Sequence, residues 1–373
     1  MSTVFKVLAK MIAIIFALLL VLAIPLSIVS YDVGRVVFNP PLVKQVITDL
    51  LTESDLIPVA LEWYSVSRAE ERYEEGEAQA WQDEPDMVQL MSKLDTEDWK
   101  EIRELILPNY ILTDWIHMIV DDAYTWIDNE EPVPQITLSL IPVIDRLDED
   151  HEYGQNAILI AYRGLDPCND EQIADYKARQ AVADGDEVLY NLCQFPGTCQ
   201  DDAYSYGCDQ LNDYVESLGN VVSSVPDKIE LTKELTQAKD TELDGLLVIK
   251  NQLRLIRLLV DLTPLIPLAL LLLVLLFAVR SLKGLGMWWG IPITLGSLIT
   301  FIIALLYRPL LAAFLMSGSM SEIPALIRAA SLEGMTRLMA VIFQPMPGQS
   351  IVALLLGIVL IIVMIIAKPA REK

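Results

Sequence analysis

The chain has 373 residues, 53% of them hydrophobic, and a formal net charge of −24 at pH 7. Such a negative protein repels nucleic acid and anionic lipid headgroups, which excludes DNA and RNA as partners. With two histidines and four cysteines in the whole chain, few groups remain for catalysis or for holding a transition metal.

Four long apolar segments without a charged residue occur along the chain, one near its start and three in its last third. Each approaches the roughly 20 residues that a helix needs to cross a bilayer. Because backbone polar groups in lipid must bond to one another, these segments are predicted to be transmembrane helices. They cover residues 11–29, 262–279, 287–307 and 351–367. For residues 1–30 a cleaved signal peptide is the alternative, although the apolar run exceeds the usual length of one.

Lysine and arginine predict how these helices are oriented. The short segments 1–10, 280–286 and 368–373 all carry them, and they fall on one side of the membrane if the chain crosses it four times. Such segments face the cytoplasm as a rule. We therefore expect a multi-pass protein of the cell membrane with both termini cytoplasmic and with residues 30–261 and 308–350 extracytoplasmic.

The acidic charge is concentrated in the first of these outer segments. Residues 31–257 hold 47 Asp and Glu against 17 Lys and Arg, whereas the rest of the chain is net positive. A well-solvated outer domain is the simplest explanation of this charge. Binding of cations or of a basic protein partner fits it equally.

Within residues 30–261, apolar side chains recur at three- and four-residue steps, which predicts a mostly helical domain. The most regular helix runs from Ile111 to Ile127. Thr96, followed by two acids, is expected to cap the helix before it. Alternation of apolar and polar residues around Leu138 predicts a short strand.

All four cysteines lie in the same domain, within 41 residues of one another. An even number of cysteines on the oxidising side of a membrane indicates disulfides. Of the three possible connectivities, we expect Cys168–Cys193 and Cys199–Cys208. Zinc is the alternative, but its typical pairs of cysteines two residues apart are absent.

A helical stalk over residues 243–260 is predicted to lead into the second span, which Pro264 and Pro267 should kink. We expect Arg257 and Asp261 to pair as i, i+4 neighbours at the boundary between water and lipid. The outer loop 308–350 contains an amphipathic helix pattern. We expect that helix to dock beneath the outer domain; lying on the outer leaflet is the alternative.

Two acidic clusters are the only metal candidates, because carboxylate oxygens suit calcium, although neither cluster matches the spaced twelve-residue calcium loop. The candidate residues are Asp145, Asp148, Asp150, Asp184, Asp186 and Glu187. No other cofactor is expected.

The chain contains none of the common nucleophile, nucleotide or metalloprotease motifs, so it is not expected to be an enzyme. The predicted spans hold no ionisable residue, which disfavours coupled transport.

The order of one span, a large outer domain and three further spans resembles that of ABC-type permeases that act mechanically on periplasmic partners. The resemblance concerns topology alone and implies a cytoplasmic segment that engages an ATPase. The inner loop available for that purpose, residues 280–286, has seven residues.

The predicted fold is therefore mainly α, with a four-helix transmembrane anchor and a large, mostly helical, disulfide-containing extracytoplasmic domain that includes short strands. Folded material is abundant and reactive groups are scarce. The chain is best interpreted as a non-catalytic interaction, assembly or sensing module that presents an acidic domain to a protein partner. A permease-like subunit of a mechanically coupled complex is the alternative, followed by a passive pore formed by a homo-oligomer.

Overall fold

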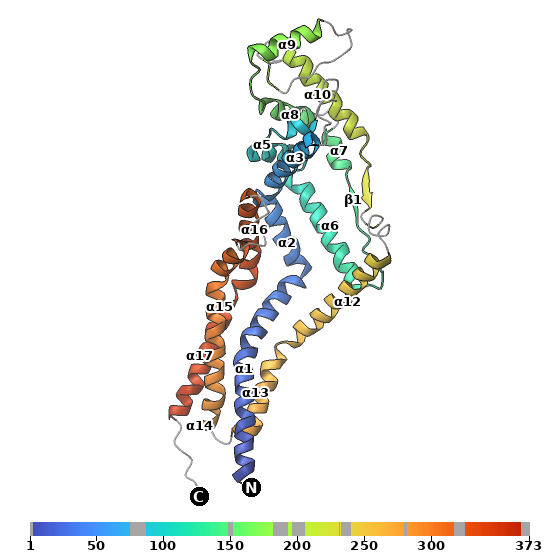
Figure 1. The fold of residues 1–373 in the computed structure, drawn as a ribbon. Coiled ribbons are helices and arrows are strands. Elements are labelled where there is room, and N and C mark those ends of the chain that lie inside the picture. Colours follow the sequence, from blue (N-terminus) through green and yellow to red (C-terminus); the bar gives the residue numbers. More distant parts are fainter. Residues whose placement is uncertain are drawn as a thin grey trace.

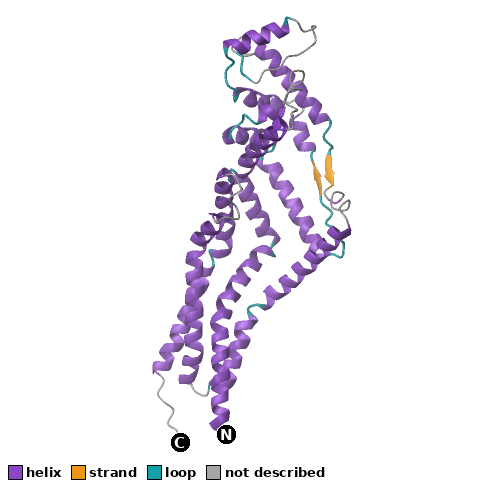
Figure 2. Cartoon of the chain, in the orientation of Figure 1, coloured by secondary structure: helices purple, strands orange, loops and turns teal. Residues whose placement is uncertain are grey.

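The computed structural model describes residues 3–74, 87–147, 152–181, 193–195, 206–230, 232, 240–279, 282–316 and 325–366. Figure 1 shows an elongated molecule in which long helices form a bundle at one end and shorter helices form a head at the other. Within the described residues the chain is helical almost throughout, with one two-stranded sheet (Figure 2). The mainly α fold expected from the sequence is confirmed.

Four long helices pack together, and we call them the apolar bundle. They are α1 (Thr3–Val37), α13 (Leu265–Ala278), α15 (Ile291–Met316) and α17 (Met346–Ile366). α1 packs against α13 and α15, and α15 packs along α17. α1 begins and α17 ends at the same end of the bundle (Figure 1).

Three helical stretches of the described chain are long and apolar enough to cross a membrane: Lys10–Val37, Gly286–Phe314 and Ile327–Ile366. A fourth candidate is a bent pair, Gly245–Leu262 followed by Leu265–Ala278, whose halves meet at 44°. The two halves belong to α12 (Asp240–Leu262) and α13, so the break lies at Thr263 and Pro264, where proline was expected to kink the chain.

Small residues let the bundle helices approach closely where the chain enters α15. The short helix α14 (Leu282–Leu285) leads into a π-helical turn, Gly286–Gly290, which packs against α17. A Cβ atom at Gly286 would lie 2.3 Å from the carbonyl oxygen of Leu360, and one at Gly357 would lie 2.9 Å from the backbone nitrogen of Thr294. Only glycine fits these backbone contacts.

The head contains the remaining elements up to residue 230. They are α2 (Pro40–Glu53), α3 (Leu56–Glu74), α4 (Met87–Met91), α5 (Thr96–Ile106), α6 (Asn109–Asp128), β1 (Thr137–Ser139), α7 (Ile141–Leu147), α8 (Glu152–Arg163), α9 (Asp170–Gln180), α10 (Tyr206–Ser223) and β2 (Lys228–Glu230). β1 and β2 are antiparallel, with Leu138 opposite Ile229. The short strand expected around Leu138 is thus part of a two-stranded ribbon.

The main core of the head joins α4, α5, α8 and α10. Its largest fully buried side chains are Leu90 and Tyr214, and Trp99 and Ile158 pack in the same cluster. A second cluster joins α2 to α6 through Leu112, Ile116 and Val120.

The start of α5 differs by one residue from the sequence prediction. Asp95 is the N-cap and forms a capping box with Asp98, whereas Thr96 is the first helical residue. The hydroxyl of Thr96 instead donates to a carboxylate oxygen of Glu62 on α3. A carboxylate serves this position well because it also faces the positive end of the helix dipole.

α9 is held to the head through a disulfide. Cys168 is bonded to Cys193, the first of the two expected bridges. Backbone hydrogen bonds from Cys168 to Gln194 and from Gln194 to Asp166 align the two segments, and the ring of Phe195 packs at a tilt against Tyr176 of α9 with centroids 4.8 Å apart. Cys199 and the side chain of Cys208 lie outside what the structure describes, so the second bridge stays a prediction.

Candidate functional site

The most unusual polar group of the bundle is the carboxyl of Asp32. It lies in the apolar stretch of α1 that ends at Val37, yet only 1% of its surface is exposed. Its Oδ1 accepts a hydrogen bond of 2.8 Å from the amide of Gln349 on α17. Its Oδ2 is buried and has no hydrogen-bond partner among the described residues.

Asp32 belongs to a polar layer of the bundle. Val36, Ala304 and Met346 form one apolar cluster between α1, α15 and α17. Asp32, Thr300 and Ser350 each lie one helical turn from one of these residues, on the side away from the head. All three are buried, the last two completely. The three helices therefore place a carboxyl and two hydroxyl groups at one level of an otherwise apolar interior.

A second unsatisfied group lies deeper in the same interior. Ser297 on α15 is fully buried, and its Oγ has no hydrogen-bond partner in the described chain. Ser27 on α1 is also buried, and its hydroxyl donates to the carbonyl oxygen of Thr263 at the break between α12 and α13. The interior of the bundle is thus polar at several consecutive levels of α1 and α15.

A second feature is the junction at which the bundle side of α12 meets the end of α6. Lys250, Arg254 and Arg257 of α12 form what we call the α12 clamp. Lys250 is 3% exposed, and its ammonium donates to the carbonyl oxygen of Glu131 at 2.6 Å. Arg254 donates to the carbonyl oxygens of Ile127 and Asn129. Three cations thereby meet the negative end of the α6 dipole.

Arg257 completes the clamp through an ion pair with Asp128, the last residue of α6, at 2.9 Å. The sequence had predicted a pair with Asp261 instead. No such pair forms, because the basic face of α12 is turned toward α6 and Asp261 is exposed.

α6 also holds the end of α1. The hydroxyl of Tyr124 donates to the carbonyl oxygen of Val37, where α1 stops. Burial raises the pKa of Tyr124 above its ordinary value, and the nearby positive charge of Arg257 acts in the opposite direction. The phenol therefore remains a proton donor at neutral pH. Both chain segments that connect the bundle to the head, α1 and α12, are bound to the same end of α6.

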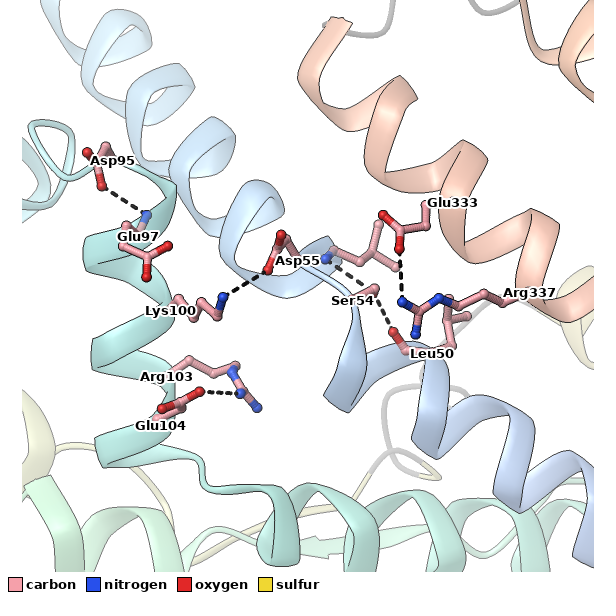
Figure 3. A network of polar contacts seen from close by, with 11 residues as sticks. Leu50, Ser54, Asp55, Asp95, Glu97, Lys100, Arg103, Glu104, Glu333 and Arg337 are labelled. Carbon is pink, nitrogen blue, oxygen red and sulfur yellow. Dashed lines mark hydrogen bonds and ion pairs between the residues drawn. The ribbon is translucent and has the colours of Figure 1, made fainter.

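On the other side of the head, α2 and α3 meet at an elbow formed by Ser54 and Asp55 (Figure 3). The hydroxyl of Ser54 donates to the carbonyl oxygen of Leu50 at 2.5 Å and accepts from the backbone nitrogen of Leu56 at 3.3 Å. Lys100 of α5 lies 3.6 Å from the carboxylate of Asp55. The elbow is therefore fixed by its own hydroxyl and by a neighbouring helix.

The helix α16 (Ala325–Phe343) docks on this elbow, as expected for the amphipathic helix within residues 308–350. Its Arg337 pairs with Glu333 at 2.9 Å on the same helix and with Glu53 at 3.0 Å at the end of α2. A Cβ atom at Gly334 would lie 2.4 Å from a methyl carbon of Leu50, which shows how closely the two helices approach. The head is thus joined to the bundle side at two separate places.

An aromatic patch lies on the head away from these junctions. The guanidinium of Arg146 on α7 lies 5.7 Å from the ring centre of Tyr110 and 4.3 Å from that of Tyr153. It also donates to the carbonyl oxygen of Leu105 at 2.5 Å, which fixes its position. Tyr110 and Tyr153 are 59% and 42% exposed, and Ile141, at the start of α7, is 47% exposed.

A shallow hollow of about 450 Å³ lies between α2 and α6 of the head. His117 lies in it, beside Lys44, whose ammonium is already paired with Asp121 at 2.7 Å. The other lining residues are Pro41, Gln45, Thr48 and Asp49. The lining thus combines a histidine with side chains of opposite charge.

The calcium candidates are mostly outside the described residues. Asp145 is exposed on α7, whereas Asp148, Asp150, Asp184, Asp186 and Glu187 lie in the parts of the chain that the structure does not describe. In the described parts, no group of three or more His, Cys, Asp or Glu side chains is placed to hold a metal ion.

Sequence reasoning missed Asp32, because the first span was expected to end at Val29 and the helix continues to Val37. A signal was present: Asp32 is four residues after Ile28 and four before Val36, so all three share one face of the helix.

Comparisons of the chain with protein-family models, with curated proteins and with solved structures found no match.

Proposed function

We propose that this chain is a non-enzymatic membrane protein that holds an acidic helical head outside the bilayer, where the head binds a basic protein partner. In this proposal the four helices of the apolar bundle span the membrane, with residues 262–279 as the second span and α12 as the stalk that joins it to the head. Both termini are then cytoplasmic. Long exposed side chains on the bundle surface support it, since Leu276, Val352 and Ile365 are each at least 69% exposed and suit contact with lipid.

The observation that carries this proposal is the double attachment of the head. The α12 clamp and Tyr124 hold one side of it through α6, and Arg337 holds the other side through the elbow. A head that were merely a soluble domain on a flexible linker would need neither junction. Two junctions give it a fixed orientation relative to the membrane helices, which suits a platform for a partner and allows partner binding to act on the helices.

The aromatic patch is the best partner surface on the head. Exposed tyrosines beside a positioned arginine resemble the residues that dominate protein interfaces, because large rigid side chains bury much area at low entropic cost. The surrounding segment is strongly acidic, with 47 Asp and Glu against 17 Lys and Arg in residues 31–257. Charge complementarity therefore favours a basic partner and predicts that association weakens as salt is added.

Photocrosslinking in native membranes tests this function. A photoreactive phenylalanine derivative would replace Tyr110 or Tyr153, and in a matched control it would replace Val221, which is 52% exposed on α10. We expect positions 110 and 153 to capture one and the same basic protein, with a yield that falls as salt is raised. Position 221 should not capture it.

Equal capture from all three positions would contradict a specific surface at the patch. Capture of a second copy of this chain from positions 110 and 153 would assign the patch to self-association instead. Capture of lipid alone would place the patch at the membrane surface. Each of the three results would overturn the proposed partner surface.

A further inference from the structure

The buried carboxyl of Asp32 requires a compensating interaction that the described residues do not provide. A buried polar atom without a partner is rare in folded proteins and indicates an unseen water, ion or proton. Gln349 satisfies Oδ1 as a neutral donor, at 2.8 Å, but nothing in the described chain donates to Oδ2. An isolated charged carboxylate in apolar surroundings is far more costly than a neutral acid.

The charged groups on the neighbouring helices do not supply that compensation. Arg35, one turn further along α1, acts on Asp32 only across space and is exposed at the helix surface. On α17 the residues beside Asp32 are the neutral Gln349 and Ser350. Charged side chains on α2, α12, α15 and α16 have other partners or are exposed, among them Lys44, Arg257, Asp261, Arg308 and Arg337.

We infer that Asp32 is a proton-binding site inside the membrane bundle and carries its proton on Oδ2. A protonated carboxyl keeps a carbonyl oxygen that accepts from Gln349 and gains one O–H donor. The buried hydroxyls of Thr300 and Ser350, at the same level of the bundle, are acceptors suited to an O–H group, directly or through a water. A proton therefore removes the charge without any new side chain.

The position of Asp32 also gives the proton a short route to water. Val37, where the apolar stretch of α1 ends, is the fifth residue after Asp32, and at 1.5 Å per residue this is about 8 Å. Val37 is bonded to Tyr124 of the head. Loss of the proton would leave a charged carboxylate buried between apolar helices, a cost that the single hydrogen bond from Gln349 does not offset, so protonation favours the packing of α17 on α1. The packing of the bundle helices near the head is thus expected to depend on pH through Asp32.

Infrared spectroscopy of the full-length protein in lipid nanodiscs tests this site. We expect a carbonyl-stretch band of a protonated carboxylic acid at neutral pH, which shifts when water is replaced by D2O. The band should vanish in Asp32→Asn and persist in Asp114→Asn, a control at an exposed carboxylate of α6. In Gln349→Leu the same band should move in frequency, because its carbonyl loses a hydrogen bond.

Circular dichroism would establish that each variant is folded before its spectrum is compared. A band that is unchanged in folded Asp32→Asn would show that it belongs to another carboxyl, and the inference would fail. A band that vanishes in that variant but does not shift in D2O would show a proton sealed from water, which overturns the exchange route. Absence of any such band in the natural sequence would show Asp32 to be ionised.

Discussion

Replacing Gly286 by alanine is expected to destabilise the bundle by about 3 kcal/mol, since overpacking of a tight core typically costs a few kcal/mol. The new Cβ atom would lie 2.3 Å from the carbonyl oxygen of Leu360 and 2.5 Å from the Cβ of Met364. Both atoms are backbone or next to it, so neither can rotate away. α17 must separate from the start of α15, and the loss extends along the whole contact between these helices.

The matched control is Gly348→Ala in α17, where an added Cβ atom meets nothing within 4 Å. In that helix alanine should be neutral or stabilising by up to about 1 kcal/mol. Thermal unfolding of the two variants in detergent, followed by size-exclusion chromatography after heating, provides the comparison. Equal midpoints for Gly286→Ala and Gly348→Ala would show that the close approach between α15 and α17 is absent.

Replacing Trp99 by alanine is expected to cost the head about 4 kcal/mol, in the range of large-to-small substitutions of buried aromatic residues. Trp99 is 6% exposed and packs in the main core with Leu90 and Tyr214. The cavity left by the indole would lie between α5 and the helices that cover it. Since a domain of this size is stable by only about 5–15 kcal/mol, the head should unfold at a much lower temperature.

Trp63→Ala is the matched control, because Trp63 on α3 is 46% exposed. Its loss should change stability by less than about 1 kcal/mol. Near-ultraviolet circular dichroism during heating reports on the packing of the remaining aromatic residues in both variants. If Trp63→Ala proved as damaging as Trp99→Ala, the assigned core of the head would be wrong.

Local sequence patterns predicted much of the fold. The apolar spacing from Ile111 to Ile127 predicted the helix observed as α6, and its apolar stripe is buried against α2. The break at Pro264 follows from a ring that cannot continue the helix. The docking of α16 was expected because its apolar side chains need cover. In each case the cause lies within about twenty neighbouring residues.

The features that escaped prediction depend on partners remote in sequence. Arg257 pairs with Asp128, which is 129 residues away, and no local spacing distinguishes this carboxylate from Asp261. The sequence predicted Asp32 to lie beyond the first span, because a charged residue usually marks the end of an apolar segment. Its burial depends on helices that pack against α1, one of which carries Gln349 as a donor. Such sites become visible only when helices are placed side by side.

Membrane-impermeant maleimide labelling tests most directly whether the head is outside and the bundle spans the membrane. Single cysteines would be introduced by Tyr110→Cys on the head and by Lys10→Cys near the start of α1, both at exposed positions. The account predicts that intact cells label Tyr110→Cys, whereas Lys10→Cys reacts only after the membrane is opened. Labelling of Lys10→Cys in intact cells, with Tyr110→Cys protected until lysis, would contradict it.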